Sequence, residues 1–166
     1  MSNKPSSVLS PRKFIFFDVD GVLIDGYHYN AAHRKLWNIN LEKDLGIPLQ
    51  TMEIYFRENW ADVLVGRKDL TRSLRDFLHN KGHHENASDV MTYWFEKDSK
   101  INPDTWEIVT RLHQKKNCAL YLATNQEHQR AAYLWNILNF KSMFQDIFYS
   151  GAMGVTKKRS AVFHAH

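Results

Sequence analysis

The chain has 166 residues, of which 43% are hydrophobic and 24% are charged, as expected for a globular protein of one domain, with or without a modest insertion. It contains no apolar run approaching the roughly 18 residues needed to span a bilayer, and its first thirteen residues lack the continuous apolar core of a signal peptide. The formal net charge of +4 comes with short basic clusters only, which disfavours a nucleic-acid-binding protein.

The first predicted element is a strand in KFIFF, Lys13 to Phe17, a short apolar run typical of a strand buried on both faces of a parallel sheet. It runs directly into Asp18 and Asp20. Two unit charges ~4 Å apart repel by about 4 kcal/mol at an effective dielectric of 20. A cation, or a proton held on Asp20, would relieve that repulsion. The pair therefore suggests one ionised carboxylate acting as a nucleophile and one protonated carboxyl acting as an acid.

Residues 26 to 102 show no convincing strand pattern. Apolar residues at helical spacing predict one helix from Met52 to Val63 and another from Leu70 to Leu78. The segment SDVMTYWFEK predicts a third helix, with Ser88 as its N-cap. We interpret this region as a helical insertion that splits an α/β core directly after its first strand.

From Ile101 onward the predicted order is helix, strand, helix, strand. Asn102 and Pro103 suit the N-cap and first position of a helix, and CALYLA, Cys118 to Ala123, is the next strand. Because Cys118 is the only cysteine, no internal disulfide can form, which fits a reducing, cytoplasmic compartment.

The second half of this unit is an amphipathic helix, in which Ala131, Leu134, Trp135 and Leu138 share one face, followed by a weaker strand, Asp146 to Ser150. The order predicts a right-handed parallel crossover. The fold class is therefore α/β, a Rossmann-like parallel-sheet core at 1–25 and 103–166 with a helical cap at 26–102. Because ligands bind beyond the carboxyl ends of parallel strands, Asp18 and Thr124 should face one crevice.

Three segments together resemble a known family. FIFFDVDGVLID looks like the first motif of the haloacid dehalogenase-like (HAD) hydrolases, LYLATNQ resembles the second, and FQDIFYSGAMGVTKKRSAVF is similar to the third. The similarity runs from Phe14 to Phe163, with the insertion in the position of the small α-helical cap of these enzymes.

The resemblance implies a role for each matching residue. Asp18 would be the nucleophile that forms an aspartyl-phosphate, and Asp20 would be the general acid and base. Asp18 and the backbone carbonyl of Asp20 would help to hold Mg²⁺. Thr124, together with a backbone N–H near Asn125 at a helix start, would bind the transferring phosphoryl group. Lys157 would neutralise charge on the nucleophile and the phosphate.

Two departures from the family pattern accompany this assignment. Lys158 is a rival for the role of Lys157, because the residues that follow differ from the usual P-x-P. The fourth family motif, a strand ending in paired acids that supply a further Mg²⁺ ligand, has no counterpart before His166. We therefore expect either a shortened chain or another cover for the first strand, which becomes an edge strand, together with weak Mg²⁺ binding.

The expected function is that of a Mg²⁺-dependent phosphatase acting on a small phosphorylated metabolite, as a monomer or homodimer, without nucleic-acid or membrane partners. Haloacid dehalogenases lack the second acid of the pair, so Asp20 argues against that chemistry. A phosphomutase of the β-phosphoglucomutase type retains both acids and stays open as an alternative. A non-catalytic HAD-like remnant that binds a partner or ligand is the alternative from another class.

Overall fold

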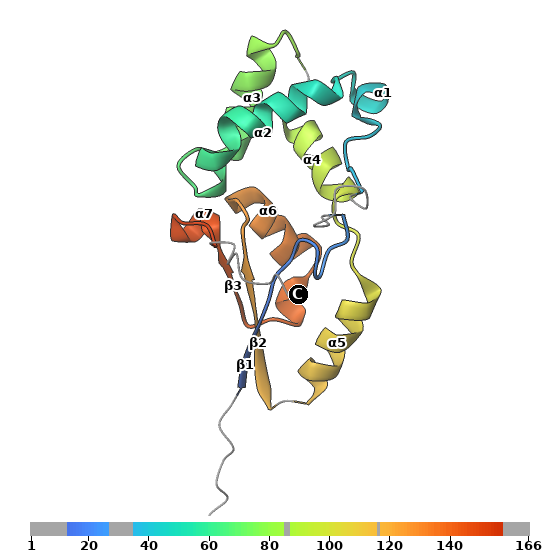
Figure 1. Ribbon diagram of the computed structural model, residues 1–166, viewed down its shortest axis with the longest axis vertical. Helices are drawn as coiled ribbons and strands as arrows, with labels where there is room; N and C mark the ends of the chain where they lie inside the picture. Colours follow the sequence, from blue (N-terminus) through green and yellow to red (C-terminus); the bar gives the residue numbers. More distant parts are fainter. Residues whose placement is uncertain (1–12, 27–34, 85–86, 116, 158–166) are drawn as a thin grey trace, which may run out of the picture.

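The structure is a computed structural model that describes residues 13–26, 35–84, 87–115 and 117–157. In the described part of the chain, the strands β1 (Lys13–Phe17), β2 (Cys118–Thr124) and β3 (Asp146–Tyr149) form a sheet in the order β1-β2-β3 (Figure 1). The α-helices are α1 (Leu41–Leu45), α2 (Leu49–Leu64), α3 (Leu70–Asn80), α4 (Ala87–Lys97), α5 (Pro103–Gln114), α6 (His128–Ala132) and α7 (Ser150–Met153). A π-helical turn, Tyr133–Ile137, continues α6, and a 3-10 turn, Phe140–Ser142, precedes β3.

Both strand pairings are parallel, which confirms the predicted α/β class. β1 pairs with β2 from Lys13↔Cys118 to Phe17↔Leu122, and β2 pairs with β3 up to Thr124↔Tyr149. The carboxyl ends of the strands therefore meet at one edge of the sheet. Asn102 is the N-cap of α5, as predicted: its side chain accepts a hydrogen bond of 2.9 Å from the N–H of Thr105, and Pro103 follows at the first helical position.

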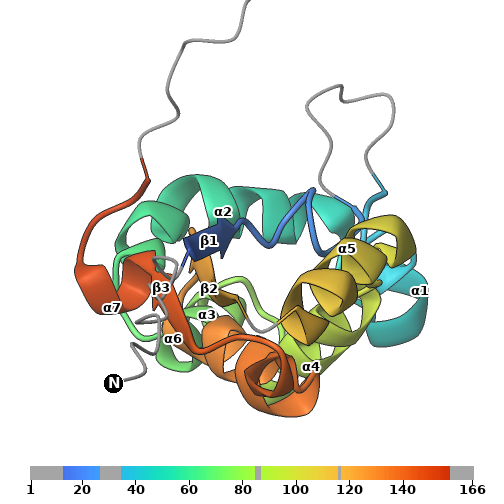
Figure 2. The same cartoon turned by 90° about the horizontal axis from the view of Figure 1, so that it is seen from below.

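One face of the sheet is packed and the other is open, which corrects the prediction that the first strand is buried on both faces. Ile15 and Phe17 point into the core beneath α5 and α6, which lie on the same side of the sheet in Figures 1 and 2. Phe14 and Phe16, on the alternate face, are 63% and 56% exposed. Successive residues of a strand point to opposite faces, and no described element covers the second face.

The open face is aromatic. The ring of Phe16 stacks on Tyr121 with centroids 5.3 Å apart and lies 6.0 Å from Phe148. Within the described residues β1 pairs only with β2, so it is an edge strand, as the sequence led us to expect. We call Phe14, Phe16, Tyr121 and Phe148 the aromatic face.

The insertion has an apolar core of its own. Helices α1 to α4 surround a cluster distinct from the one beneath the sheet, and Figure 1 shows them beyond the carboxyl ends of the strands. We call this region the cap; its boundaries at 26 and 102 stay a prediction. Ser88 is not the N-cap of α4, because the helix already includes Ala87. In the described ranges no helix combines the length and the apolarity that crossing a membrane requires.

The two chain segments that join cap and core run side by side. The N–H of Asp25 donates to the carbonyl of Lys100 at 2.7 Å, and the N–H of Asn102 donates to that of Leu23 at 2.9 Å. The side-chain amide of Asn102 also donates to the Asp25 carboxylate at 3.0 Å. The cap is thus joined to the core through a paired connection beside the carboxyl end of β1.

Candidate active site

Asp18 and Asp20 lie in a tight turn that directly follows β1. The N–H groups of Leu23 and Ile24 both donate to the carbonyl of Val19, at 2.8 and 2.9 Å. Gly21 has a φ of 77°, a left-handed conformation that a residue with a Cβ adopts at a cost. The fully buried side chains of Val19 and Leu23 hold the turn against the core. The two carboxyl groups consequently remain at the end of the sheet where strand ends converge.

Asp18 is paired with the predicted lysine. Its Oδ2 lies 2.7 Å from Nζ of Lys157, and its Oδ1 accepts a hydrogen bond of 2.8 Å from the N–H of Val19. The Asp18 side chain is 42% exposed, so its carboxylate is within reach of a ligand. The structure therefore brings together residues separated by most of the chain. Lys158, the rival lysine, lies outside the described residues.

Two contacts at the end of β2 position Lys157. Its Nζ donates to the carbonyl of Ala123 at 2.9 Å, and its backbone N–H donates to Oδ1 of Asn125 at 2.7 Å. The Asn125 side chain thus holds the lysine backbone, a contact that the sequence did not suggest. The role expected there was a backbone N–H at a helix start, whereas α6 begins only at His128.

Asp20 differs from Asp18 in its surroundings. Burial raises the pKa of Asp20 to about 6; the charge of Arg130 opposes this shift, and the carboxylates of Asp98 and Asp18 add to it. Its Oδ2 accepts a hydrogen bond of 2.6 Å from the side-chain amide of Gln126. A carboxyl in this environment retains its proton more readily than an ordinary aspartate does.

Thr124 is the last residue of β2 and is 2% exposed. Its hydroxyl has no hydrogen-bond partner among the described residues. An unsatisfied buried polar group costs about 1–3 kcal/mol, so an oxygen-bearing ligand at this strand end would satisfy it. Thr124 lines a small cavity of about 200 Å³ shared with Lys157, rather than the larger cavity above Asp18.

The larger cavity, of about 540 Å³, lies between core and cap. Its core side is formed by the two aspartates, Lys157 and three residues from the loop after β2 and from α6. The cap contributes two indole rings, an aliphatic side chain and a carboxylate, which we call the cap wall. The lining residues are Asp18, Asp20, Asn125, Gln126, Arg130 and Lys157 on the core side, and Trp60, Leu64, Trp94 and Asp98 in the cap wall.

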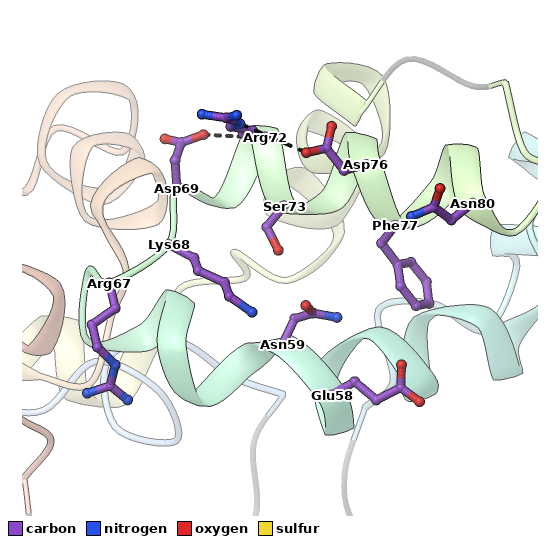
Figure 3. A pocket seen from close by; sticks show the side chains of 10 residues that line it. All are labelled: Glu58, Asn59, Arg67, Lys68, Asp69, Arg72, Ser73, Asp76, Phe77 and Asn80. Carbon is purple, nitrogen blue, oxygen red and sulfur yellow. Dashed lines mark hydrogen bonds and ion pairs between the residues drawn. The ribbon is translucent and has the colours of Figure 1, made fainter.

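A cavity of about 560 Å³ also opens between α2 and α3, within the cap (Figure 3). Several charged groups at its rim have partners in the structure. Arg67 and Lys68 both contact the carboxylate of Asp62, and Arg72 lies 3.9 Å from Asp76. These pairs satisfy the charges within the cap itself. Since none of the proposed catalytic residues lines this cavity, we place the site in the one above Asp18.

A buried charged cluster, which the sequence pattern does not indicate, lies beside Asp20. Glu127 and Arg130 are 1% and 2% exposed. Glu127 is the N-cap of α6, where its carboxylate accepts from the N–H groups of Gln129 and Arg130. Burial raises the pKa of Glu127 to about 7, raises that of Asp98 and lowers that of Arg130. Glu127 and Arg130 stand in the polar segment NQEHQR, whose residue pattern does not indicate that they are buried.

The oxygen atoms at this site suit a hard divalent cation. The Asp18 carboxylate and the backbone carbonyl of Asp20 are oxygen donors of the kind that Mg²⁺ prefers. Among the described residues no three histidine, cysteine or acidic side chains converge on one point. As far as the described residues go, water and substrate oxygens would complete the coordination shell of such an ion.

Comparisons with known proteins point to one family. A family model described as haloacid dehalogenase-like hydrolase matches residues 13–164. A search of individually curated proteins found no match.

Solved structures with a similar fold include the HAD family enzyme bt-2542 from Bacteroides thetaiotaomicron, in complex with magnesium and inorganic phosphate. It has a TM-score of 0.66 and 16% identity, over 90% of this chain and 74% of that chain. The HAD-hydrolase YfnB from Bacillus subtilis, bound to magnesium, has a TM-score of 0.51 and 19% identity, over 89% of this chain and 69% of that chain. A 2-haloacid dehalogenase from Pseudomonas syringae pv. Tomato DC3000 has a TM-score of 0.55 and 17% identity, over 86% of this chain and 66% of that chain. At these identities the likeness is one of fold.

Proposed function

Because this chain belongs to the haloacid dehalogenase-like hydrolase family, we propose that it is a Mg²⁺-dependent phosphohydrolase that acts on a small organic phosphate through an aspartyl-phosphate. The observation that carries the proposal is the contrast between two carboxyls two residues apart. Asp18 is accessible and paired with the Lys157 ammonium at 2.7 Å, whereas burial raises the pKa of Asp20 to about 6. One group is thus suited to attack as an anion and the other to deliver a proton.

In the first step a carboxylate oxygen of Asp18 attacks phosphorus. The bond from phosphorus to the ester oxygen breaks, and the Asp20 carboxyl gives its proton to the departing alcohol. Lys157 offsets negative charge on the phosphoryl oxygens; the buried Thr124 hydroxyl faces the smaller cavity on the other side of Lys157 and takes no part in this step. A Mg²⁺ ion held by Asp18 and the Asp20 carbonyl would neutralise phosphate charge.

In the second step water attacks the aspartyl-phosphate. Asp20, now ionised, removes a proton from that water, and the bond from phosphorus to the Asp18 oxygen breaks. Inorganic phosphate leaves, and both carboxyls return to their starting states. The same group therefore serves as acid and then as base, which a pKa near the working pH makes possible.

Magnesium is part of the proposal because bt-2542 and YfnB were both solved with it. The substrate is a small phosphorylated metabolite whose organic part would lie against Trp60 and Trp94 of the cap wall, since aromatic side chains commonly line such pockets. A cytoplasmic location, monomeric or homodimeric assembly and independence of nucleic acid and membrane belong to the same proposal.

The test is release of inorganic phosphate from aryl phosphates by the full chain, with and without Mg²⁺. Asp18→Asn should abolish turnover and trapping by beryllofluoride. Asp20→Asn should slow turnover by about 10² to 10⁴-fold, the usual contribution of general acid–base catalysis, while Asp18 still accepts phosphate from reactive donors. Conversion of glucose 1-phosphate to glucose 6-phosphate without net phosphate release would show the mutase instead. Phosphate release that Asp18→Asn leaves unchanged would refute the mechanism.

A further inference from the structure

A core arginine holds the end of the cap. Arg130, in α6, is 2% exposed. Its Nη1 donates to the carbonyl of Phe95 at 3.0 Å and to the hydroxyl of Ser99 at 2.7 Å. Its Nη2 donates to the carbonyl of Asp98. All three acceptors belong to the last turn of α4 and the segment that returns the chain to the core.

One of these contacts, to the carbonyl of Phe95, satisfies a group that α4 cannot satisfy by itself. The last four carbonyls of an α-helix lack intrahelical partners, and a cation near that end also interacts favourably with the helix dipole. The guanidinium lies over the rings of Phe95 and Tyr133, whose centroids are 5.2 and 5.6 Å from Cζ and 5.3 Å from each other. A buried guanidinium is tolerated only where its N–H groups have hydrogen-bond acceptors. Arg130 and residues 95–99 therefore hold each other in place.

The same segment carries part of the cap wall. Trp94 and Asp98 both line the cavity above Asp18. The indole N–H of Trp94 donates to the Asp98 carboxylate at 3.3 Å, and Nη2 of Arg130 lies 3.9 Å from that carboxylate. A shift of the segment relative to α6 would therefore move the wall relative to the aspartates.

We propose that Arg130 is a positioning residue that anchors residues 95–99 of the cap to α6 and thereby sets the place of the cap wall above the catalytic aspartates. Its hydrogen bonds act through the cap and its charge also lowers the pKa of Asp20, whereas Lys157 and Asp20 act on the phosphoryl group. The kinetic part of its test rests on the proposed phosphohydrolase function; the structural part does not.

The structural part is hydrogen exchange of the backbone amides in residues 95–102. Arg130→Met should speed their exchange by about tenfold or more, because the segment loses its hydrogen bonds to a charged group, which are stronger than those between neutral groups. Ser99→Ala, which removes one acceptor of Arg130 together with the hydrogen bond that the hydroxyl donates to the carbonyl of Phe95, should give a smaller increase. Exchange around Val109 in α5 should stay unchanged in both. Arg111→Met, an exposed arginine paired with Glu107, is the matched control.

The kinetic part compares a large substrate with a small one. Arg130→Met should raise KM for 4-nitrophenyl phosphate about tenfold or more, because slight misplacement of binding groups is costly. It should lower turnover of acetyl phosphate by a clearly smaller factor, which includes the effect of the lost Arg130 charge on the pKa of Asp20. Arg130→Lys, which keeps the charge without the planar fork, should recover part of the difference. If Arg130→Met does not fold, Ser99→Ala should still raise KM for the larger substrate.

Unchanged exchange of residues 95–102 in the folded variants would overturn the anchor. An equal loss on both substrates would also overturn it, because Arg130 would then act on the aspartates directly. A wild-type chain that hydrolyses neither substrate would refute the phosphohydrolase, while the exchange measurement would still decide the anchor.

Discussion

The side-chain amide of Gln126 donates a hydrogen bond of 2.6 Å to Oδ2 of Asp20, although 106 positions separate the two residues in the chain. Gln126 is 4% exposed and follows β2, whereas Asp20 follows β1. The parallel pairing of the two strands brings their ends together. The proposed acid and base is therefore oriented by a residue of the neighbouring strand end.

Gln126→Leu should slow turnover by up to about 100-fold, because a misoriented catalytic group loses much of its effect. The hydrogen bond from Gln126 lowers the pKa of Asp20, so its loss should raise that pKa further. Hydrolysis of the aspartyl-phosphate, which needs Asp20 as a base, should slow more than its formation. Rapid-quench measurement of both steps checks this, with the exposed Gln114→Leu as control. Equal slowing of both steps would contradict the effect of Gln126 on the pKa of Asp20 and leave orientation alone to explain the loss.

Lys157→Met should lower turnover by about 10² to 10³-fold, as is typical when a group that stabilises transition-state charge is removed. Lys158→Met provides the matched control, because the sequence alone left the two lysines as rivals. Its turnover should stay close to that of the wild-type chain. Steady-state phosphate release decides between them, and the reverse ranking of the two variants would transfer the role to Lys158.

Glu127→Gln should stabilise the protein increasingly as the pH rises. Burial raises the pKa of Glu127 from 4.5 to about 7. Folding therefore favours the protonated form of Glu127. The stability that this group contributes is fully present below pH 4.5 and is lost as the pH rises towards 7. The variant minus wild-type difference in unfolding free energy should grow by on the order of 3 kcal/mol between pH 4.5 and pH 8. Urea unfolding at both pH values measures it. Glu107→Gln, at an exposed position, should show no such growth. If the difference for Glu127→Gln is the same at both pH values, the raised pKa of Glu127 is refuted.

The aromatic face should make this chain self-associate. Phe14 and Phe16 are more than half exposed on an edge strand, and exposed apolar patches and edge strands both promote association. Phe16→Ser should shift sedimentation-velocity profiles towards monomer at a given concentration. Ile108→Ser in α5, which alters an isolated apolar side chain that is 50% exposed, should not. If both variants associate as the wild-type chain does, the aromatic face is not the contact.

Local patterns in the sequence were sufficient for the three strands and for helices α2 to α6, but not for the short helices α1 and α7. Asn102 and Pro103 mark the start of α5 because capping depends on adjacent residues. The apolar runs of β1 and β2 identify strands, and parallel pairing then places Asp18 and Thr124 at one edge. Lys157 was reached through a family motif, and the structure puts its Nζ beside Asp18.

Burial and long-range pairing were decided only by the tertiary structure. An apolar run does not reveal which face of its strand is covered. Phe14 and Phe16 are exposed because no described element lies over their face of the sheet. Gln126 and Arg130 stand in a polar segment and look solvated. Their partners, Asp20 and the carbonyls at the end of α4, are distant in the chain. A buried polar group is stabilised by the partners that folding brings to it, and those partners are known only once the chain has folded.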